Sequence, residues 1–95
     1  RRVVAGLERA VQAQRNTGMA RLRRAAALAG QKKYAEAEQQ GEGGFAILQQ
    51  VASPASVEVQ QALGVLGHIY AGNGKPEKKE EVERTLMRNR QTRPN

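Results

Sequence analysis

The chain has 95 residues, with sixteen Lys and Arg against nine Asp and Glu, no cysteine, no tryptophan and three aromatic side chains. This length allows one domain or a part of one, and an apolar fraction of 39%, rich in alanine, predicts a thin hydrophobic core. The lack of cysteine excludes disulfides and thiolate chemistry, and the single histidine, His68, argues against a His-rich metal site or a Ser-His-Asp triad. No apolar stretch approaches the ~20 residues of a membrane-spanning helix. We therefore expect no enzymatic activity, no cofactor and no membrane span.

The cellular compartment stays open, because the usual indicator of redox environment is cysteine and the chain has none. No signal-peptide pattern is present. The first residue is Arg1 rather than Met, which favours a processed or excised product.

The net charge of +7 is unevenly distributed along the chain. Residues 1–33 carry nine bases and only Glu8, for +8, whereas residues 34–74 carry four acids and no base, for −4. Residues 75–95 return to +3. Such a layout produces a directional field, so the N-terminal third favours an anionic partner, unless its bases only solvate helix faces. The anionic partner would be an acidic protein or RNA.

Apolar side chains recur every three or four residues, which is typical of amphipathic helices, and no useful strand-like alternation occurs. The first two expected helices span about residues 2–15 and 19–30. Asn16-Thr17-Gly18 predicts the turn between them, because glycine tolerates the positive φ of a helix end. Gly30 and the polar residues after it predict the next turn.

The third expected helix runs from Tyr34 to about residue 52 and contains the run Gly41-Glu42-Gly43-Gly44. Each interior glycine costs ~1 kcal/mol relative to alanine. The run therefore indicates a helix held by tight packing against a neighbour, or else a kink or break. It lacks the preceding strand and the Gly-Lys-Ser/Thr ending of a phosphate-binding P-loop.

Ser53-Pro54 predicts the start of a fourth helix, with Ser53 as its N-cap. Gly72-Asn73-Gly74 is a strong turn signal, and Pro76 begins a fifth helix that continues to about residue 90. Residues 91–95 form a polar tail that we expect to fray. Five helices joined by short turns predict an all-α, antiparallel, single-domain array over residues 1–95.

An offset of 42 residues relates two parts of the chain. Residues 30–38 align with residues 72–80, and upstream positions pair at the same offset, Ala25 with Gly67 and Leu28 with Tyr70. An internal repeat of helical hairpins indicates a solenoid rather than a bundle.

The stretch Leu66-Gly67-His68-Ile69-Tyr70, followed by Gly74-Lys75-Pro76, resembles the first helix and glycine turn of the tetratricopeptide (TPR) repeat. The run Lys33-Tyr34-Ala35-Glu36-Ala37-Glu38 is similar to the start of its second helix. The longer period and the Ser-Pro restart are similar to the kinesin-light-chain type. The resemblance implies antiparallel hairpins stacked as a short TPR-like α-solenoid. Residues 1–15 would end a partial repeat, and residues 19–52 and 55–90 would form two further repeats.

The resemblance also implies a concave face built from helices 19–30 and 55–71. Its predicted partner-binding residues are Leu22, Arg23, Ala26, Gln61, Val65 and His68, with Arg21 and Arg24 completing a basic cluster. His68 has no second metal ligand three or four residues away, so we expect it to contact a partner or to pack.

Two functions remain open from the sequence. The first is a non-enzymatic protein–protein interaction module, an adaptor, scaffold or assembly factor that docks another protein through the concave face and the basic N-terminal patch. The alternative is a basic peripheral subunit of a large assembly that contacts RNA or an anionic surface. Residues 1–33 contain no stacking aromatic, which weighs against single-stranded RNA.

Overall fold

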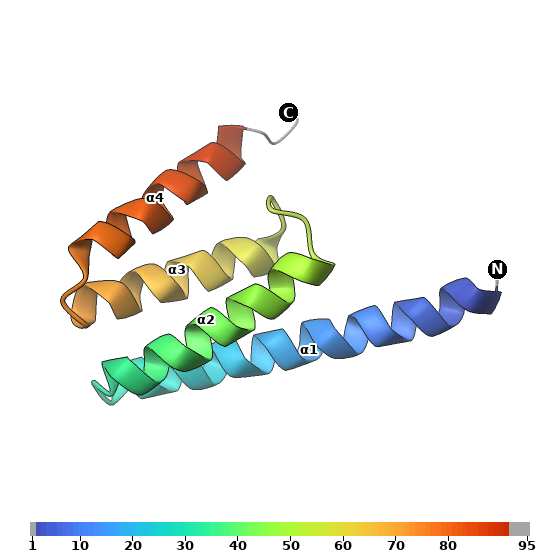
Figure 1. The fold of residues 1–95 in the computed structure, drawn as a ribbon, viewed down its shortest axis with the longest axis horizontal. Helices are drawn as coiled ribbons and strands as arrows, with labels where there is room; N and C mark the ends of the chain where they lie inside the picture. Colours follow the sequence, from blue (N-terminus) through green and yellow to red (C-terminus); the bar gives the residue numbers. More distant parts are fainter. Residues whose placement is uncertain (1, 92–95) are drawn as a thin grey trace.

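The structure is a computed structural model that describes the backbone of residues 2–91 and the side chains of residues 6–89. It contains four helices and no strand within that range: α1 (Arg2–Gly30), α2 (Tyr34–Val51), α3 (Val57–Gly72) and α4 (Pro76–Gln91). Consecutive helices are antiparallel, α1 packs on α2 and α3, and α3 packs on α2 and α4 (Figure 1). The all-α prediction is confirmed, with four helices in place of five. The predicted frayed tail lies, apart from Gln91, outside the described residues.

The turn predicted at Asn16-Thr17-Gly18 is wrong, because α1 runs unbroken through it. The polar side chains there bond along the helix. The Gln12 amide donates to Asn16 Oδ1 at 3.0 Å, and the Thr17 hydroxyl donates to a backbone carbonyl one turn earlier. Gly18 is buried against α2, where a Cβ would lie 3.0 Å from Leu48 Cγ. The glycine permits a helix crossing, and residues 2–15, predicted as a separate helix, are part of α1.

The glycine run at residues 41–44 does not break α2 either. The two helices meet along a stripe of buried residues that we call the α1–α2 seam. On each helix, successive residues of the seam are four, three and four positions apart. Its members are Gly18, Leu22, Ala25 and Ala29 on α1, and Ala37, Gly41, Gly44 and Leu48 on α2, all of them buried. Small side chains on this stripe let the two backbones approach closely, which offsets the low helix propensity of the glycines.

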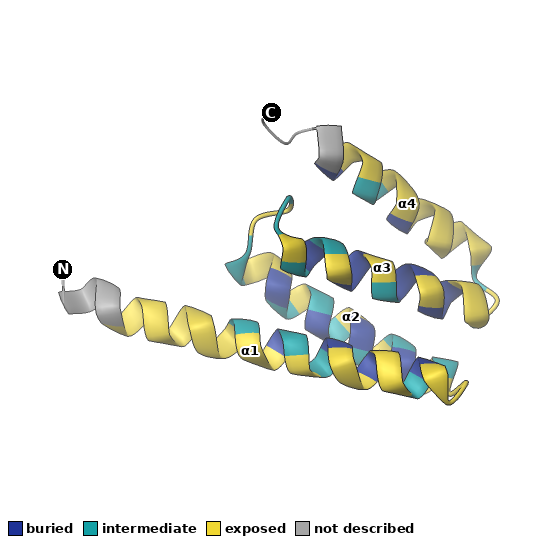
Figure 2. Ribbon diagram, turned by 180° about the vertical axis from the view of Figure 1, so that it is seen from behind, coloured by how far each residue is buried: buried dark blue, intermediate teal, exposed yellow. Residues whose placement is uncertain are grey.

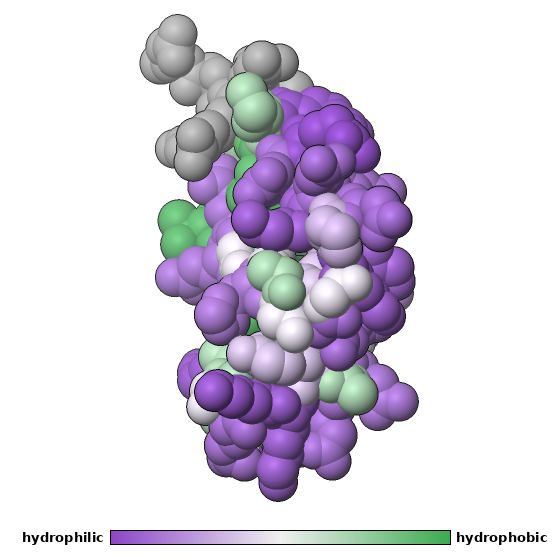
Figure 3. Space-filling view, turned by 90° about the vertical axis from the view of Figure 1, so that its left-hand side faces the viewer, coloured by the Kyte–Doolittle hydropathy of each residue, from purple (hydrophilic) through white to green (hydrophobic). Residues whose placement is uncertain are grey.

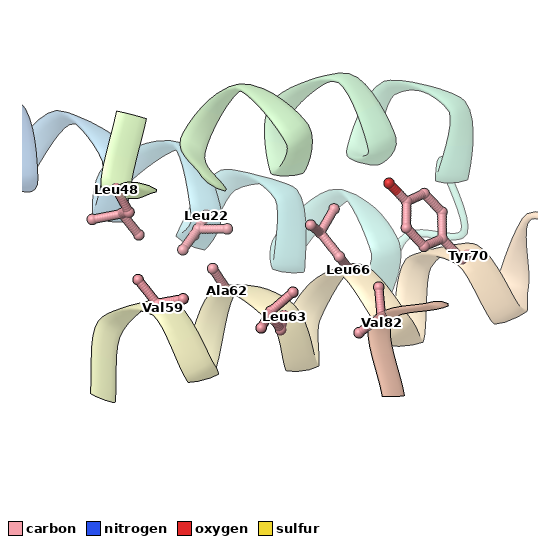
Figure 4. Close-up of a cluster of buried hydrophobic side chains, with 8 residues drawn as sticks. All are labelled: Leu22, Leu48, Val59, Ala62, Leu63, Leu66, Tyr70 and Val82. Carbon is pink, nitrogen blue, oxygen red and sulfur yellow. The ribbon is translucent and has the colours of Figure 1, made fainter. Parts of the chain in front are cut away.

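The main hydrophobic core is centred on α3, which supplies Val59, Ala62, Leu63, Leu66 and Tyr70. The other three helices complete it with one side chain each, namely Leu22, Leu48 and Val82 (Figure 4). A second, smaller cluster of alanines with Ile69 lies under the α1–α2 turn. Gly67, which aligns with Ala25, makes only ordinary contact, since a Cβ there would lie 3.6 Å from Val82 Cγ1.

Helix α3 begins three residues later than Ser53 predicts. Ser56 is the N-cap, and its hydroxyl oxygen accepts a hydrogen bond from the backbone N–H of Val59 at 3.2 Å. The predicted N-cap at Ser53 is therefore wrong. Helices α2 and α4 begin at Tyr34 and Pro76, as predicted, and their starts are 42 residues apart.

The same offset relates the backbone of the two hairpin turns. Lys33 N–H donates to the Leu28 carbonyl at 2.9 Å, and Lys75 N–H donates to the Tyr70 carbonyl at 2.9 Å. The residue before each donor has positive φ, 63° at Lys32 and 71° at Gly74. Both turns are Schellman endings, in which a left-handed residue closes the helix. The sequence repeat is thus also a repeat of turn geometry.

Candidate functional site

A groove of about 480 Å³ lies between α1 and α3. Four residues of each helix line it: Met19, Leu22, Arg23 and Ala26 from α1, and Gln61, Gly64, Val65 and His68 from α3. In Figure 2 these two helices lie in front of α2, so the groove belongs to the side of the molecule away from α2. Most of its lining is apolar, and Arg23 is the one charged residue among those that line it.

Six of the eight residues predicted from the sequence line this groove. Leu22 forms part of its floor and is only 3% exposed, because it also belongs to the core, and Val65 is half-buried. The remaining four, Arg23, Ala26, Gln61 and His68, are exposed. The prediction missed Met19 and Gly64, although each stands three or four residues from a predicted member of the same helix face.

Arg21 and Arg24 do not lie in the groove. The half-buried Arg21 side chain turns toward α2, where its Nε donates to Gln40 Oε1 at 3.4 Å and its guanidinium covers Gly43. Arg24 is exposed and is absent from the lining of the groove. Because successive helix residues are about 100° apart, neighbouring arginines in the sequence point in different directions. The basic cluster is therefore spread over several faces of α1.

The ion pairs among residues 6–89 lie away from the groove, and two of the four join α2 to the α3–α4 turn or to α4. Glu38 of α2 accepts from Lys75 Nζ at 2.8 Å and from Asn73 Nδ2 at 3.0 Å. The Lys75 hydrogen bond, with the Asn73 bond and nearby lysine charges, outweighs desolvation and lowers the pKa of Glu38. This arrangement fastens α2 to the α3–α4 turn.

A second carboxylate of α2 binds the one aromatic residue of α3. The Tyr70 hydroxyl donates to Glu42 Oε2 at 2.6 Å, and Lys78 Nζ lies 5.5 Å from the centre of the tyrosine ring. Burial, followed by the Glu42 hydrogen bond, raises the pKa of Tyr70 well above its usual range. Tyr70 thus stays protonated and acts as a hydrogen-bond donor within the fold.

The end of the molecule that holds the two hairpin turns is mostly hydrophilic around a small paler centre (Figure 3). Lys32, Lys33, Glu36 and Asn73 line a shallow hollow there, beside Tyr34. The half-buried Tyr34 ring lies against Gly72, where a Cβ would overlap it. This end is a solvated face.

The side chains of residues 6–89 contain no group of three or more His, Cys, Asp or Glu placed to hold a metal ion. Over the same part of the chain, no helix combines the length and apolarity needed to cross a bilayer. The groove between α1 and α3 is therefore the candidate binding site. Comparisons with protein-family models, with curated proteins and with solved structures found no match.

Proposed function

We propose that this chain is a non-enzymatic protein–protein interaction module that docks a segment of another protein in the groove between α1 and α3. The observation that carries the proposal is the groove itself, an apolar recess of about 480 Å³ between the first helices of two successive hairpins. Concave, largely apolar recesses with a few polar groups are the usual form of a binding site.

The repeated hairpins support a TPR-like α-solenoid as the architecture behind this site. The pairs α1–α2 and α3–α4 end their first helices in the same Schellman turn, 42 residues apart. Contacts join each helix to its successor and α1 to α3. In a solenoid of stacked hairpins, the first helices of neighbouring repeats line one continuous face, and the groove lies on that face.

The lining indicates what kind of segment would bind. Arg23 can pair with a carboxylate, and no acidic side chain lines the groove to compete for it. Met19, Leu22 and Val65 supply apolar contact area. We therefore propose a partner segment with an apolar side chain that fills the recess and an acidic residue that reaches Arg23.

The test compares two chains that each replace one helix glycine by glutamate. Gly64 lines the groove and has no atom within 4 Å of a Cβ position, so Gly64→Glu adds a charge to the recess without disturbing the core. Gly30→Glu is the matched control, since Gly30 is equally unobstructed, is exposed and lies outside the groove. Proteins captured by the wild-type chain from the source cells should be lost with Gly64→Glu and kept with Gly30→Glu. Equal capture by both variants would refute the proposal.

One observation favours the second candidate, contact with RNA or an anionic surface. In every ion pair among residues 6–89, the base is Lys75 of the α3–α4 turn or a residue of α4. The arginines of α1 between residues 6 and 30 take part in none of these pairs. Arg15 and Arg21 donate to α2, whereas Arg9, Arg23 and Arg24 are exposed and can reach phosphates. Binding to phosphates weakens steeply as the salt concentration rises. The slope of log K against log salt concentration is about −0.9 for each duplex phosphate that the protein neutralises. The affinity of an apolar docking site should depend far less on salt.

A further inference from the structure

Helices α2 and α4 both pack on α3, but over their described residues their backbones do not meet. Figure 1 shows α2 and α4 lying on either side of α3. Two adjoining hollows of about 470 and 240 Å³ lie between them, and Phe45, Gln49 and Thr85 line both hollows. We call this space the α2/α4 trough. It shares no lining residue with the α1/α3 groove.

The floor of the trough is the main hydrophobic core. Leu63 and Leu66 of α3 and Val82 of α4 are buried there (Figure 4). Phe45 of α2 is half-buried on one wall and packs against the same cluster. On the other wall the lining runs along α4 from residue 81 to residue 89, which is about 12 Å at the rise of an α-helix. The trough is therefore an apolar-floored recess about two helical turns long.

The two ends of the trough carry opposite charges. At one end, the Oε2 atom of Glu42 accepts from the Tyr70 hydroxyl and lies 3.8 Å from Lys78 Nζ, which leaves Oε1 without a partner among residues 6–89. Glu81 lines the same end and has no ion pair in that part of the chain, so the two carboxylates outnumber Lys78. Arg88 stands seven residues after Glu81, on the same flank of α4, and is likewise unpaired among the described side chains. An acidic end and a basic end thus lie two helical turns apart.

This charge pattern indicates what fits the trough. We propose that it binds a helix of a partner protein that carries a basic and an acidic residue seven positions apart, with apolar residues between them. Positions i, i+3, i+4 and i+7 of a helix share one face, so the base would reach Glu42 and Glu81 while the acid reaches Arg88. The apolar residues would cover Phe45 and the floor. A second copy of this chain is disfavoured as the occupant, because two chains that each carry +7 repel one another.

The test uses the full chain and synthetic helical peptides of about 18 residues. The probe peptide presents Lys-x-x-Leu-Leu-x-x-Glu on one face, and a second peptide has glutamate in place of the lysine. We expect saturable binding of the probe by isothermal calorimetry. Glu81→Lys should weaken it by about three- to tenfold, because an attraction becomes a repulsion, and should make the second peptide the tighter ligand. Glu83→Lys makes the same change in net charge on the opposite flank of α4 and should alter probe affinity by less than about twofold.

Three results would overturn the proposal. The first is no saturable binding of the probe, or unchanged binding after both leucines of the probe are replaced by serine. The second is an equal loss of affinity with Glu81→Lys and Glu83→Lys, or a Glu81→Lys chain that still prefers the probe to the second peptide. The third is a concentration-dependent dimer in sedimentation equilibrium that Glu81→Lys abolishes, because the occupant would then be a second copy. Gly64→Glu should leave probe affinity unchanged, since Gly64 lines only the α1/α3 groove, so either site can fail without the other.

Discussion

The carbonyl oxygen of Gly18 lies 2.8 Å from the position that a Cβ on Gly44 would occupy. This is a contact of backbone with backbone, so neither helix can move aside without separating the whole α1–α2 seam. The same crossing places a Cβ on Gly18 3.2 Å from the Gly44 carbonyl oxygen. Two glycines, one from each helix of the hairpin, thus set how closely α1 and α2 approach, and the seam in turn positions the face of α1 that lines the groove.

Alanine at Gly44 and at Gly64 should change stability in opposite directions. Gly44→Ala should lower the free energy of unfolding by about 1–3 kcal/mol, because the added methyl overpacks a backbone contact. Gly64→Ala should raise it by about 0.5–1 kcal/mol, because the position is open and alanine is the better helix former. Urea unfolding followed by circular dichroism measures both, and stabilisation by Gly44→Ala would show that the crossing is wrongly described.

The left-handed residue of the first turn is a lysine, while its counterpart in the second turn is a glycine. Lys32 has φ 63° and Gly74 has φ 71°, and the αL region costs a non-glycine residue about 1–2 kcal/mol. Lys32→Gly should therefore stabilise the chain by about 1 kcal/mol, and Gly74→Ala should destabilise it by a similar amount. Thermal melts of the two variants check this, and a loss of stability with Lys32→Gly would contradict the equivalence of the turns.

The carboxylate of Glu38 should make stability depend on pH on the acid side. Its pKa is lowered in the folded chain, chiefly by the Lys75 hydrogen bond, so the stabilisation is complete above the unfolded value of 4.5 and is lost as pH falls through the folded value. The stability advantage of wild type over Glu38→Gln should then shrink on acidification in urea titrations. Glu83→Gln is the control, because Glu83 is 58% exposed in its pair with Lys79 and should matter little at any pH. An advantage that grows on acidification would refute this role.

Removal of the exposed N-terminal part of α1 should leave the rest of the fold intact. Deletion of residues 1–13 should change the free energy of unfolding by less than about 0.5 kcal/mol, since residues 6–14 are exposed. Arg15→Ala should cost about 1 kcal/mol or more, because it removes the hydrogen bond to the Val51 carbonyl at the end of α2. Chemical denaturation compares the two, and a large loss from the deletion alone would mean that this part of α1 packs on the fold.

Local signals located the hairpin turns because those turns depend on nearby residues. Pro76 suits the first turn of a helix, and Gly74 supplies the positive φ that closes the one before. The turn prediction at Gly18 was wrong because a glycine that ends a helix and a glycine buried at a helix crossing look the same in sequence. Gly18 is of the second kind because it packs against Gly44, twenty-six residues away. Likewise Ser53 and Ser56 both suit an N-cap, and only backbone geometry selects Ser56.

The groove could be foreseen in part, because the resemblance to a TPR repeat implied a concave face on helices 19–30 and 55–71. Ala26 and Val65 were among its predicted residues, and both line the groove. Arg21 and Arg24 were grouped with Arg23 by nearness in sequence, and the 3.6-residue turn separates them. The extent of α1 was not foreseen, because the turn expected at residues 16–18 separates residues 2–15 from the α1–α2 seam.

The central claim is that the α1/α3 groove receives a protein segment, and the absence of native cysteine allows a direct measurement. Gly64→Cys and Gly30→Cys each give a single thiol for a photoreactive label, one in the groove and one outside it. We predict that a bound partner protein crosslinks from Gly64→Cys, at a segment containing an acidic residue, and not from Gly30→Cys. Crosslinking from Gly30→Cys alone, or of RNA in place of protein from both positions, would contradict the claim.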